Sequence, residues 1–320
     1  CMSISEFQII ERYFKQARPL REDVVLGIGD DAAVLEVPPG QQLVVAMDTL
    51  VAGRHFPQQS SAFDIGYKSL AVNLSDLAAM GARPAWATLS LTLPEADERW
   101  LEAFAEGFFN LAGQYELDLV GGDTTRGPLS ITVQVSGLVK FGRALRRDSA
   151  RPGQSLFVSG TPGDAAYALR QLQSGEEADP QLLERLNRPQ PRIDFGLALA
   201  DIGATAVDVS DGLLADLGHV VDASCCGATL WVDRIPRSRR LRGEPADEVL
   251  ACQLQGGDDY ELCFALDSHR VAAARAIAAQ QELLITEIGV IEREPGIRCR
   301  HDDGSLYKPR GRGYDHFLND

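Results

Sequence analysis

The stretch LGIGDDAAVL, residues 26–35, places Asp30 and Asp31 side by side on a glycine-rich turn after an apolar run. Its glycines and Ala32 fit the G-x-G-x-x-A pattern of dinucleotide-binding proteins. That pattern needs a helix N-terminus to receive a pyrophosphate, whereas a strand-like segment follows here and two carboxylates would repel phosphate. A divalent cation removes the repulsion, because Mg²⁺ takes oxygen ligands and is usually held by few carboxylates together with phosphates. The stretch therefore favours a metal-dependent phosphate site.

Helix and strand patterns alternate outward from this stretch and predict an α/β or α+β fold. A capping-box pattern from Ser3 to Glu6 predicts a first helix, and another is expected over 64–80. The turn in SARPGQS, residues 149–155, separates two halves with the same alternation. We therefore expect two domains, residues 1–148 and 149–320. In the second, helices are expected from Pro162, Asp211 and Ser268.

Composition narrows the class of partner. The chain has 320 residues and a formal net charge of −15, so nucleic acid and anionic membranes would be repelled. The single basic run, residues 237–242, reads more simply as a solvated loop than as a phosphate site. No apolar run is long enough to span a membrane, and the start lacks a signal-peptide pattern, which predicts a cytoplasmic protein. The six cysteines show no C-x-x-C spacing, which argues against a zinc site.

Carboxylates recur where apolar runs end. Any one of them can be an ordinary turn-forming or helix-capping aspartate. Together, and next to glycines that allow close backbone approach, they predict several magnesium ions around a polyphosphate. The acids in question are Asp30, Asp31, Asp48, Asp123, Asp208, Asp211, Asp258 and Asp259.

Two further segments add to this pattern. In NLSDLAAMGA, Asn73 and Asp76 share one face of an otherwise apolar helix, so Asp76 is either a cap or ion-pair residue or a metal ligand. In GGDTTRG, residues 121–127, glycine amides, two threonines and Arg126 offer donors for phosphate oxygens beside Asp123. No G-x-x-x-x-G-K-[ST] motif occurs, which excludes a P-loop.

Six blocks, in order, resemble the thiamine-monophosphate kinase family of the aminoimidazole ribonucleotide synthetase superfamily. They extend over nearly the whole chain, from about Leu26 to the terminal GYDHF, and read GIGDDAAVL, DTLVAGRHF, KSLAVNLSDLAAMGARP, GGDTTRGPLSITV, DVSDGLLADLGH and GGDDYELCF. The resemblance implies a two-domain fold with an N-terminal sheet that forms a barrel and a C-terminal α/β domain. It also implies a homodimer built through the N-terminal domains, and transfer of the γ-phosphoryl group of ATP to thiamine monophosphate.

The resemblance also implies roles for residues at matching positions. Magnesium would be held by Asp31, Asp48, Asp76, Asp123, Asp208 and Asp211, and by main-chain carbonyls at Ala46 and Met47, where the family often has Ser or Thr. ATP would contact Gly122, Asp123, Arg147 and Ser210, and thiamine phosphate would contact His55, Asp258 and Tyr314. Many members carry Glu at the position of Asp258. No side chain is expected to act as a general base, because the accepting phosphate oxygen is already anionic.

Two alternatives stay open. A sister enzyme of the superfamily would activate an amide, a carbamoyl group or selenide with ATP. The carbamoyl-dehydrating relative ends in a cysteine and selenophosphate synthetase has a reactive Cys or selenocysteine in a glycine-rich N-terminal segment, and neither feature occurs here. A non-catalytic sensor of nucleotide or thiamine phosphate would keep the pocket without turnover.

Overall fold

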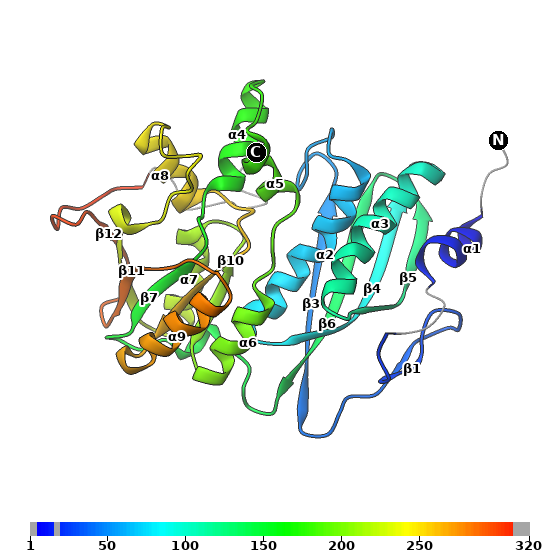
Figure 1. The fold of residues 1–320 in the computed structure, drawn as a ribbon, viewed down its shortest axis with the longest axis horizontal. Helices are drawn as coiled ribbons and strands as arrows, with labels where there is room; N and C mark the ends of the chain where they lie inside the picture. The colour runs from blue at the N-terminus through cyan, green and yellow to red at the C-terminus, as the bar shows by residue number, and fades with distance from the viewer. Residues whose placement is uncertain (1–4, 16–19, 310–320) are drawn as a thin grey trace. The chain divides into compact units, whose positions relative to one another are not determined.

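The computed structural model describes residues 5–15 and 20–309, and the chain divides into two compact units (Figure 1). Unit 1 comprises residues 1–77 and 82–142, and unit 2 comprises residues 78–81 and 143–320. The boundary expected between residues 148 and 149 falls a short way inside unit 2. The roles predicted for the two parts remain predictions.

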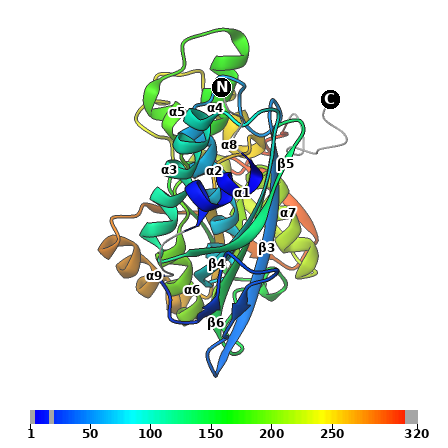
Figure 2. The same cartoon turned by 90° about the vertical axis from the view of Figure 1, so that its right-hand side faces the viewer.

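Unit 1 contains a four-stranded sheet in the order β3-β6-β4-β5, with helices α2 and α3 lying over one face of it (Figures 1 and 2). β4 and β5 pair in parallel, and the other two pairs are antiparallel. A separate two-stranded ribbon joins β1 and β2. The elements are α1 (Glu6–Ile9), the π-helix η1 (Ile10–Phe14), β1 (Val24–Leu26), β2 (Val34–Leu35), β3 (Gln41–Val51), α2 (Ala62–Ala79), β4 (Arg83–Leu93), α3 (Glu98–Gln114), β5 (Asp118–Arg126) and β6 (Ser130–Lys140).

Two glycines let α2 and α3 approach at backbone distance. A Cβ atom on Gly66 would lie 2.0 Å from the carbonyl oxygen of Phe104, and one on Gly107 would lie 2.0 Å from that of Phe63. Neither position can hold a larger residue without moving the helices apart. This contact fixes the surface of α2 that carries Asn73 and Asp76.

Unit 2 contains a six-stranded sheet in the order β12-β9-β11-β7-β10-β8, in which β12 and β9 pair in parallel and the other neighbours are antiparallel. The elements are the 3₁₀ helix η2 (Arg147–Ser149), β7 (Ser155–Ser159), α4 (Asp164–Ser174), α5 (Pro180–Asn187), α6 (Ile193–Ile202), β8 (Thr205–Val209), α7 (Leu213–Ala223), β9 (Gly227–Trp231), the 3₁₀ helix η3 (Val232–Arg234), α8 (Ala246–Gln255), β10 (Glu261–Leu266), α9 (Ser268–Gln280), β11 (Ile285–Glu292) and β12 (Gly296–Arg300).

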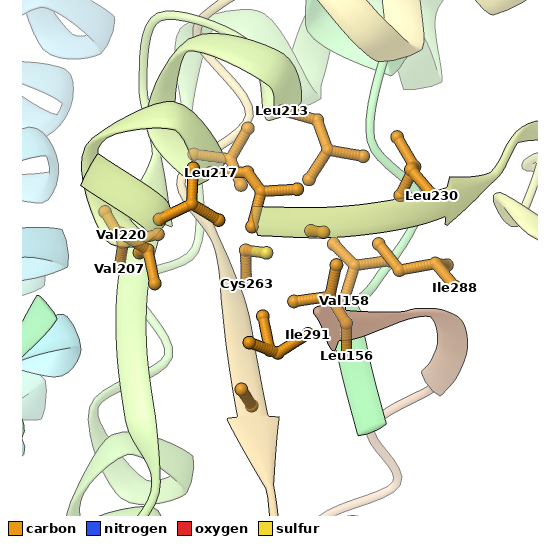
Figure 3. Packing of buried hydrophobic residues seen from close by; sticks show 14 of the residues in the cluster. Leu156, Val158, Val207, Leu213, Leu217, Val220, Leu230, Cys263, Ile288 and Ile291 are labelled. Carbon is orange, nitrogen blue, oxygen red and sulfur yellow. The ribbon is translucent and has the colours of Figure 1, made fainter. Parts of the chain in front are cut away.

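Helix α7 is held on this sheet by an apolar face. Leu213, Leu217 and Val220 lie in one buried cluster with Val207 of β8 and Cys263 of β10 (Figure 3). Burying a side chain such as leucine contributes about 1.5–3 kcal/mol. The start of α7 is therefore anchored beside the end of β8.

The structure corrects several expected boundaries. The capping box uses Ser5 and Gln8, whereas the expected Ser3 lies outside the described residues. Helices α4 and α7 each begin two residues later than expected, at Asp164 and Leu213. Among residues 5–15 and 20–309, no helix is both long and apolar enough to cross a membrane.

Candidate active site

The glycine-rich turn of the opening stretch is anchored on the sheet of unit 1. Val24 of β1 belongs to a buried cluster with Trp86 of β4 and Val120 of β5, and Ala33 and Leu35 pack against it. β2 follows the turn, so no helix begins there, and the dinucleotide-binding interpretation is excluded. The apolar residues on both sides thus hold residues 27–32 close to β4 and β5.

The two adjacent aspartates of this turn have different roles. One carboxylate oxygen of Asp30 accepts a hydrogen bond from the main-chain N–H of the next residue, Asp31, at 2.8 Å. The carboxylate of Asp31 is exposed and makes no hydrogen bond within the described part of the chain. Asp30 therefore shapes the turn, and Asp31 is the acid that remains available for a cation.

Asp123 lies inside β5, opposite Ser90 of β4, and the strand runs on past it to Arg126. The strand continues because Gly122 adopts φ 150° and passes against β4, where a Cβ atom would lie 1.8 Å from the carbonyl oxygen of Leu89. Asp48 and Asp208 also lie within strands, β3 and β8. The ladder around the glycine thus fixes the exposed carboxylate of Asp123 on a strand, which positions it more firmly than a loop would.

A cavity of about 760 Å³ brings these parts of unit 1 together. This volume is typical of a small-molecule site. Asp30, Asp31 and Asp123 line it, and Lys15, which also lines it, is paired with Glu11 at 2.9 Å. Glu11 lines it too, and the other described lining residues are mostly apolar or glycine, from α1, η1, β4, β5 and the turn between β1 and β2: Phe7, Ile10, Phe14, Ile28, Gly29, Ala32, Ala33, Thr88, Leu89, Leu119, Val120, Gly121, Gly122 and Thr124. A polyphosphate would be repelled by this excess of carboxylates unless cations came with it.

Asp48 and Asp76 do not line this cavity, but β3 and α2 are linked beside them. The main-chain N–H of Asp48 donates to Oδ1 of Asn73 at 2.9 Å, and Asp76 follows one helical turn later, half-buried. In an antiparallel pair, the N–H and C=O of one residue point to the same side. The carbonyl of Ala46 therefore faces away from β6, as the N–H of Asp48 does, and that of Met47 faces β6. Of the two predicted main-chain ligands, Ala46 is the better placed.

His55 is oriented by the main chain of unit 1. Its Nδ1 accepts a hydrogen bond from the N–H of Val51 at 2.9 Å, so in the neutral ring Nε2 carries the proton. This tautomer makes Nε2 a donor, which suits contact with a phosphate oxygen. Like Asp48 and Asp76, His55 does not line the cavity.

In unit 2, two adjoining turns carry the predicted residues Ser210, Asp211 and Asp258. The N–H of Asp258 donates to the carbonyl oxygen of Ser210 at 2.9 Å, and the N–H of Tyr260 donates to that of Val209 at 2.8 Å. Asp258 has φ 68°, and one of its carboxylate oxygens accepts a hydrogen bond from the hydroxyl of Tyr260 at 3.2 Å. The structure thus places the predicted substrate residue of this unit beside its predicted ATP-binding serine.

Asp216, in the first turn of α7, was not predicted. It is buried, and burial raises the pKa of its carboxyl group to about 8, with a further rise from the neighbouring carboxylates of Asp208 and Asp211. The sequence signal was an acid on an otherwise apolar helical face, between Leu213 and Leu217. Three carboxyl groups thus lie near the start of α7.

For two predicted binding residues, Arg147 and Tyr314, the described part of the chain shows no contact with the other predicted site residues. Arg147 is exposed on η2, where its carbonyl oxygen accepts a hydrogen bond from the hydroxyl of Ser224 at 2.7 Å. Tyr314 lies outside the described residues.

The donor set fits magnesium bound together with substrate phosphates. All the predicted ligands offer oxygen, which Mg²⁺ prefers. Within the described residues, no three His, Cys, Asp or Glu side chains are gathered as a ready metal site. Magnesium does not need such a cage, because one or two carboxylates and the substrate phosphates commonly suffice. A structural zinc or calcium site, by contrast, would need more protein ligands in place.

Comparison with known proteins identifies the family. The N-terminal domain of AIR synthase related protein matches residues 29–139, and its C-terminal domain matches residues 151–302. The thiamine-monophosphate kinase of Salmonella typhimurium is 48% identical over 99% of both chains, and that of Escherichia coli K12 is 47% identical over the same shares. This chain belongs to the thiamine-monophosphate kinase family.

Solved structures agree with this membership. The thiamine-monophosphate kinase of Stenotrophomonas maltophilia has a TM-score of 0.84 and 51% identity, covering 90% of this chain and 93% of its own. A complex of AaThiL with AMPPCP and TMP has a TM-score of 0.75 and 32% identity, covering 90% and 92%. Hydrogenase maturation protein HypE, at 20% identity and a TM-score of 0.76, shares the fold. The two-domain aminoimidazole ribonucleotide synthetase-like fold and the family predicted from the sequence are both confirmed.

Proposed function

We propose that this thiamine-monophosphate kinase family member transfers the γ-phosphoryl group of ATP to thiamine monophosphate, giving thiamine diphosphate and ADP. Near full-length identity of 47–48% to curated thiamine-monophosphate kinases carries the proposal. The AaThiL complex with AMPPCP and TMP supports it, because that relative binds a non-hydrolysable ATP analogue and TMP together. Phosphoryl transfer to a phosphate oxygen needs alignment and charge neutralisation more than proton transfer.

Each unit contributes residues suited to that task. In unit 1, Asp31, Asp48, Asp76 and Asp123, with the carbonyls of Ala46 and Met47, would hold magnesium, and in unit 2 Asp208 and Asp211 would do so. Bound magnesium would neutralise the phosphate oxygens of ATP and of the acceptor. Gly122, Asp123, Arg147 and Ser210 would orient ATP. The Nε2–H of His55 would donate to the acceptor, with Asp258 and Tyr314 as its further contacts.

Transfer would be direct. The acceptor carries its own anionic nucleophile, so no covalent phosphoenzyme is needed. In the cavity of unit 1, the acids outnumber the cations among the described residues, where Lys15 is the one cationic side chain in the lining and is paired with Glu11. Alignment by main-chain amides and neutralisation by bound cations are therefore what this chain's residues offer to the reaction.

We also propose that the enzyme is a homodimer formed through β3. This strand lies at an edge of its sheet, and an apolar row is exposed on the face opposite the buried Leu50. Leu43, Val45 and Met47 are 47%, 57% and 63% exposed. Such a row on an uncovered sheet face is typical of a protein interface. A second copy of the same surface is the partner that the family resemblance implies. The cytoplasmic location expected from the sequence stays a prediction.

An acceptor panel tests the proposed reaction. ADP release would be measured with Mg-ATP and, in turn, thiamine monophosphate, thiamine, an unrelated phosphate monoester and carbamoyl phosphate. We expect multiple turnover with thiamine monophosphate alone. Turnover with carbamoyl phosphate instead would favour a sister activity, and ligand binding without turnover would favour a sensor.

A further inference from the structure

Asp216 collects three main-chain donors on one oxygen atom. Its Oδ2 accepts hydrogen bonds from the N–H groups of Ser210 at 3.0 Å, Asp211 at 3.0 Å and Gly212 at 3.2 Å. The residue is only 3% exposed. These N–H groups precede α7, where the first residues of a helix lack main-chain partners. Gly212, at the N-terminus of α7, has no side chain to accept these bonds, so Asp216 of the first helical turn reaches back and binds the turn that leads into the helix.

The turn that Asp216 holds is also fixed from its other side. The carbonyl oxygen of Ser210 accepts the N–H of Asp258, so the two turns of unit 2 are joined through the residue that Asp216 binds. Gly212 packs closely here, since a Cβ atom on it would lie 2.8 Å from the carbonyl carbon of Gln255. Displacing the 210–212 turn would therefore move Ser210, Asp211 and Asp258 together.

We propose that Asp216 is a positioning residue, which fixes the 210–212 turn so that Ser210 and Asp211 are oriented for the nucleotide and its cation. The proposal rests on the proposed function. Asp216 acts through the main chain, and its contacts with the turn are made by one acceptor oxygen. Asparagine carries such an oxygen without the charge, whereas alanine carries none. The oxygen, and not the charge, is what the turn requires.

This distinction sets the experiment. Three variants are compared with the wild type: Asp216→Asn, Asp216→Ala and, as a control on the same helix, the exposed Asp222→Ala. Amide hydrogen exchange at residues 210–212 is measured without ligand, after circular dichroism has established that each variant is folded. We expect exchange to accelerate at least about tenfold in Asp216→Ala and to stay near the wild-type rate in Asp216→Asn and Asp222→Ala.

Kinetics on the same proteins connects the turn to the reaction. For Asp216→Ala we expect kcat to fall about 10–100-fold and the Mg²⁺ concentration for half-maximal rate to rise, because a displaced turn misaligns the reacting groups. In Asp216→Asn, kcat and the Mg²⁺ concentration for half-maximal rate should stay close to the wild-type values. If Asp216→Ala does not fold, Asp216→Asn alone decides. A fall in kcat of about 10-fold or more in folded Asp216→Asn overturns the proposal, since the charge would then matter more than the oxygen.

Two other outcomes would also contradict the positioning role of Asp216. Unchanged exchange at 210–212 in Asp216→Ala would show that the turn holds itself, and normal kinetics with accelerated exchange would show that its order does not matter. The exchange measurement needs no substrate, so it stands even if the wild type proves inactive. Wild-type inactivity towards thiamine monophosphate would instead refute the proposed function.

Discussion

Asp30 and Asp31 show how two neighbouring residues of the same type can differ in their contacts. The sequence predicted that a carboxylate here serves a cation, but it could not say that Asp30 bonds to its own turn while Asp31 makes no such bond. That difference depends on main-chain geometry within two residues. The role of Asp216 was not predicted for a similar reason. Its three hydrogen-bond donors are main-chain N–H groups, which every residue except proline has, so the sequence does not distinguish them.

The pair provides a test at the residue scale. Asparagine can accept the same hydrogen bond as Asp30, so Asp30→Asn should keep most of the activity. Asp31→Asn removes charge where cation and phosphate meet, and it should lower kcat about a hundredfold, equivalent to about 3 kcal/mol of transition-state stabilisation.

Steady-state kinetics at saturating Mg²⁺, with thermal melting of both variants, would check this prediction. Equal activity of the two variants would mean that Asp31 is an ordinary turn residue as well.

At the scale of elements, patterns that are local in sequence were predicted better than contacts between distant segments. Apolar residues spaced by three and four between Leu101 and Tyr115 predict α3, which buries that stripe. Helix α2, which is buried on nearly all sides, was instead expected from the Gly81 and Pro84 that follow it. The strand pattern of LDLVGGD, residues 117–123, ends before β5 does, because Thr124, Thr125 and Arg126 are held in the strand by pairing with β4. The buried network around Glu261 was not predicted at all. Glu261 binds Arg185 and Arg192, which lie on and after α5, and no local pattern joins them.

This network supports a prediction on stability. Burial alone would raise the pKa of Glu261, but Arg192 and Arg185 outweigh it and hold the pKa below its ordinary value. Arg192→Met would leave a buried carboxylate with one arginine and should lower the free energy of unfolding by about 3 kcal/mol at pH 7. The exposed Arg293→Met should change it by less than about 0.5 kcal/mol.

The free energy of unfolding lost in Arg192→Met should become smaller as pH falls. In the wild type, the stabilisation from ionised Glu261 is present above its unfolded-state pKa and disappears as pH falls through the lower folded-state value. In Arg192→Met, Glu261 is protonated at higher pH, and a neutral carboxyl group needs the arginine less. Urea unfolding at pH 7 and at about pH 4.5 should therefore show a smaller difference at the lower pH. A constant difference would assign the effect of Arg192 to packing.

At the scale of the whole molecule, the six sequence blocks predicted the family, which the comparisons confirm. That the acidic protein binds neither nucleic acid nor anionic membranes stays a prediction. The apolar row on β3 makes the predicted assembly testable. Val45→Asp would place a carboxylate in the proposed interface and should convert the dimer to a folded monomer in light scattering after size exclusion. Leu284→Asp, at a residue of unit 2 that is 51% exposed, should leave the dimer intact. A dimeric Val45→Asp variant would place the interface elsewhere.

The central claim is direct transfer of phosphate from ATP to thiamine monophosphate, and following the label tests it most directly. The protein would be incubated with ATP labelled in its γ-phosphate, Mg²⁺ and thiamine monophosphate, and the products and the denatured protein would be separated. We predict one label in the terminal phosphate of thiamine diphosphate for each ADP formed, and none on the protein after incubation with ATP alone. Label released as inorganic phosphate without thiamine diphosphate, or held covalently by the protein, would contradict the account.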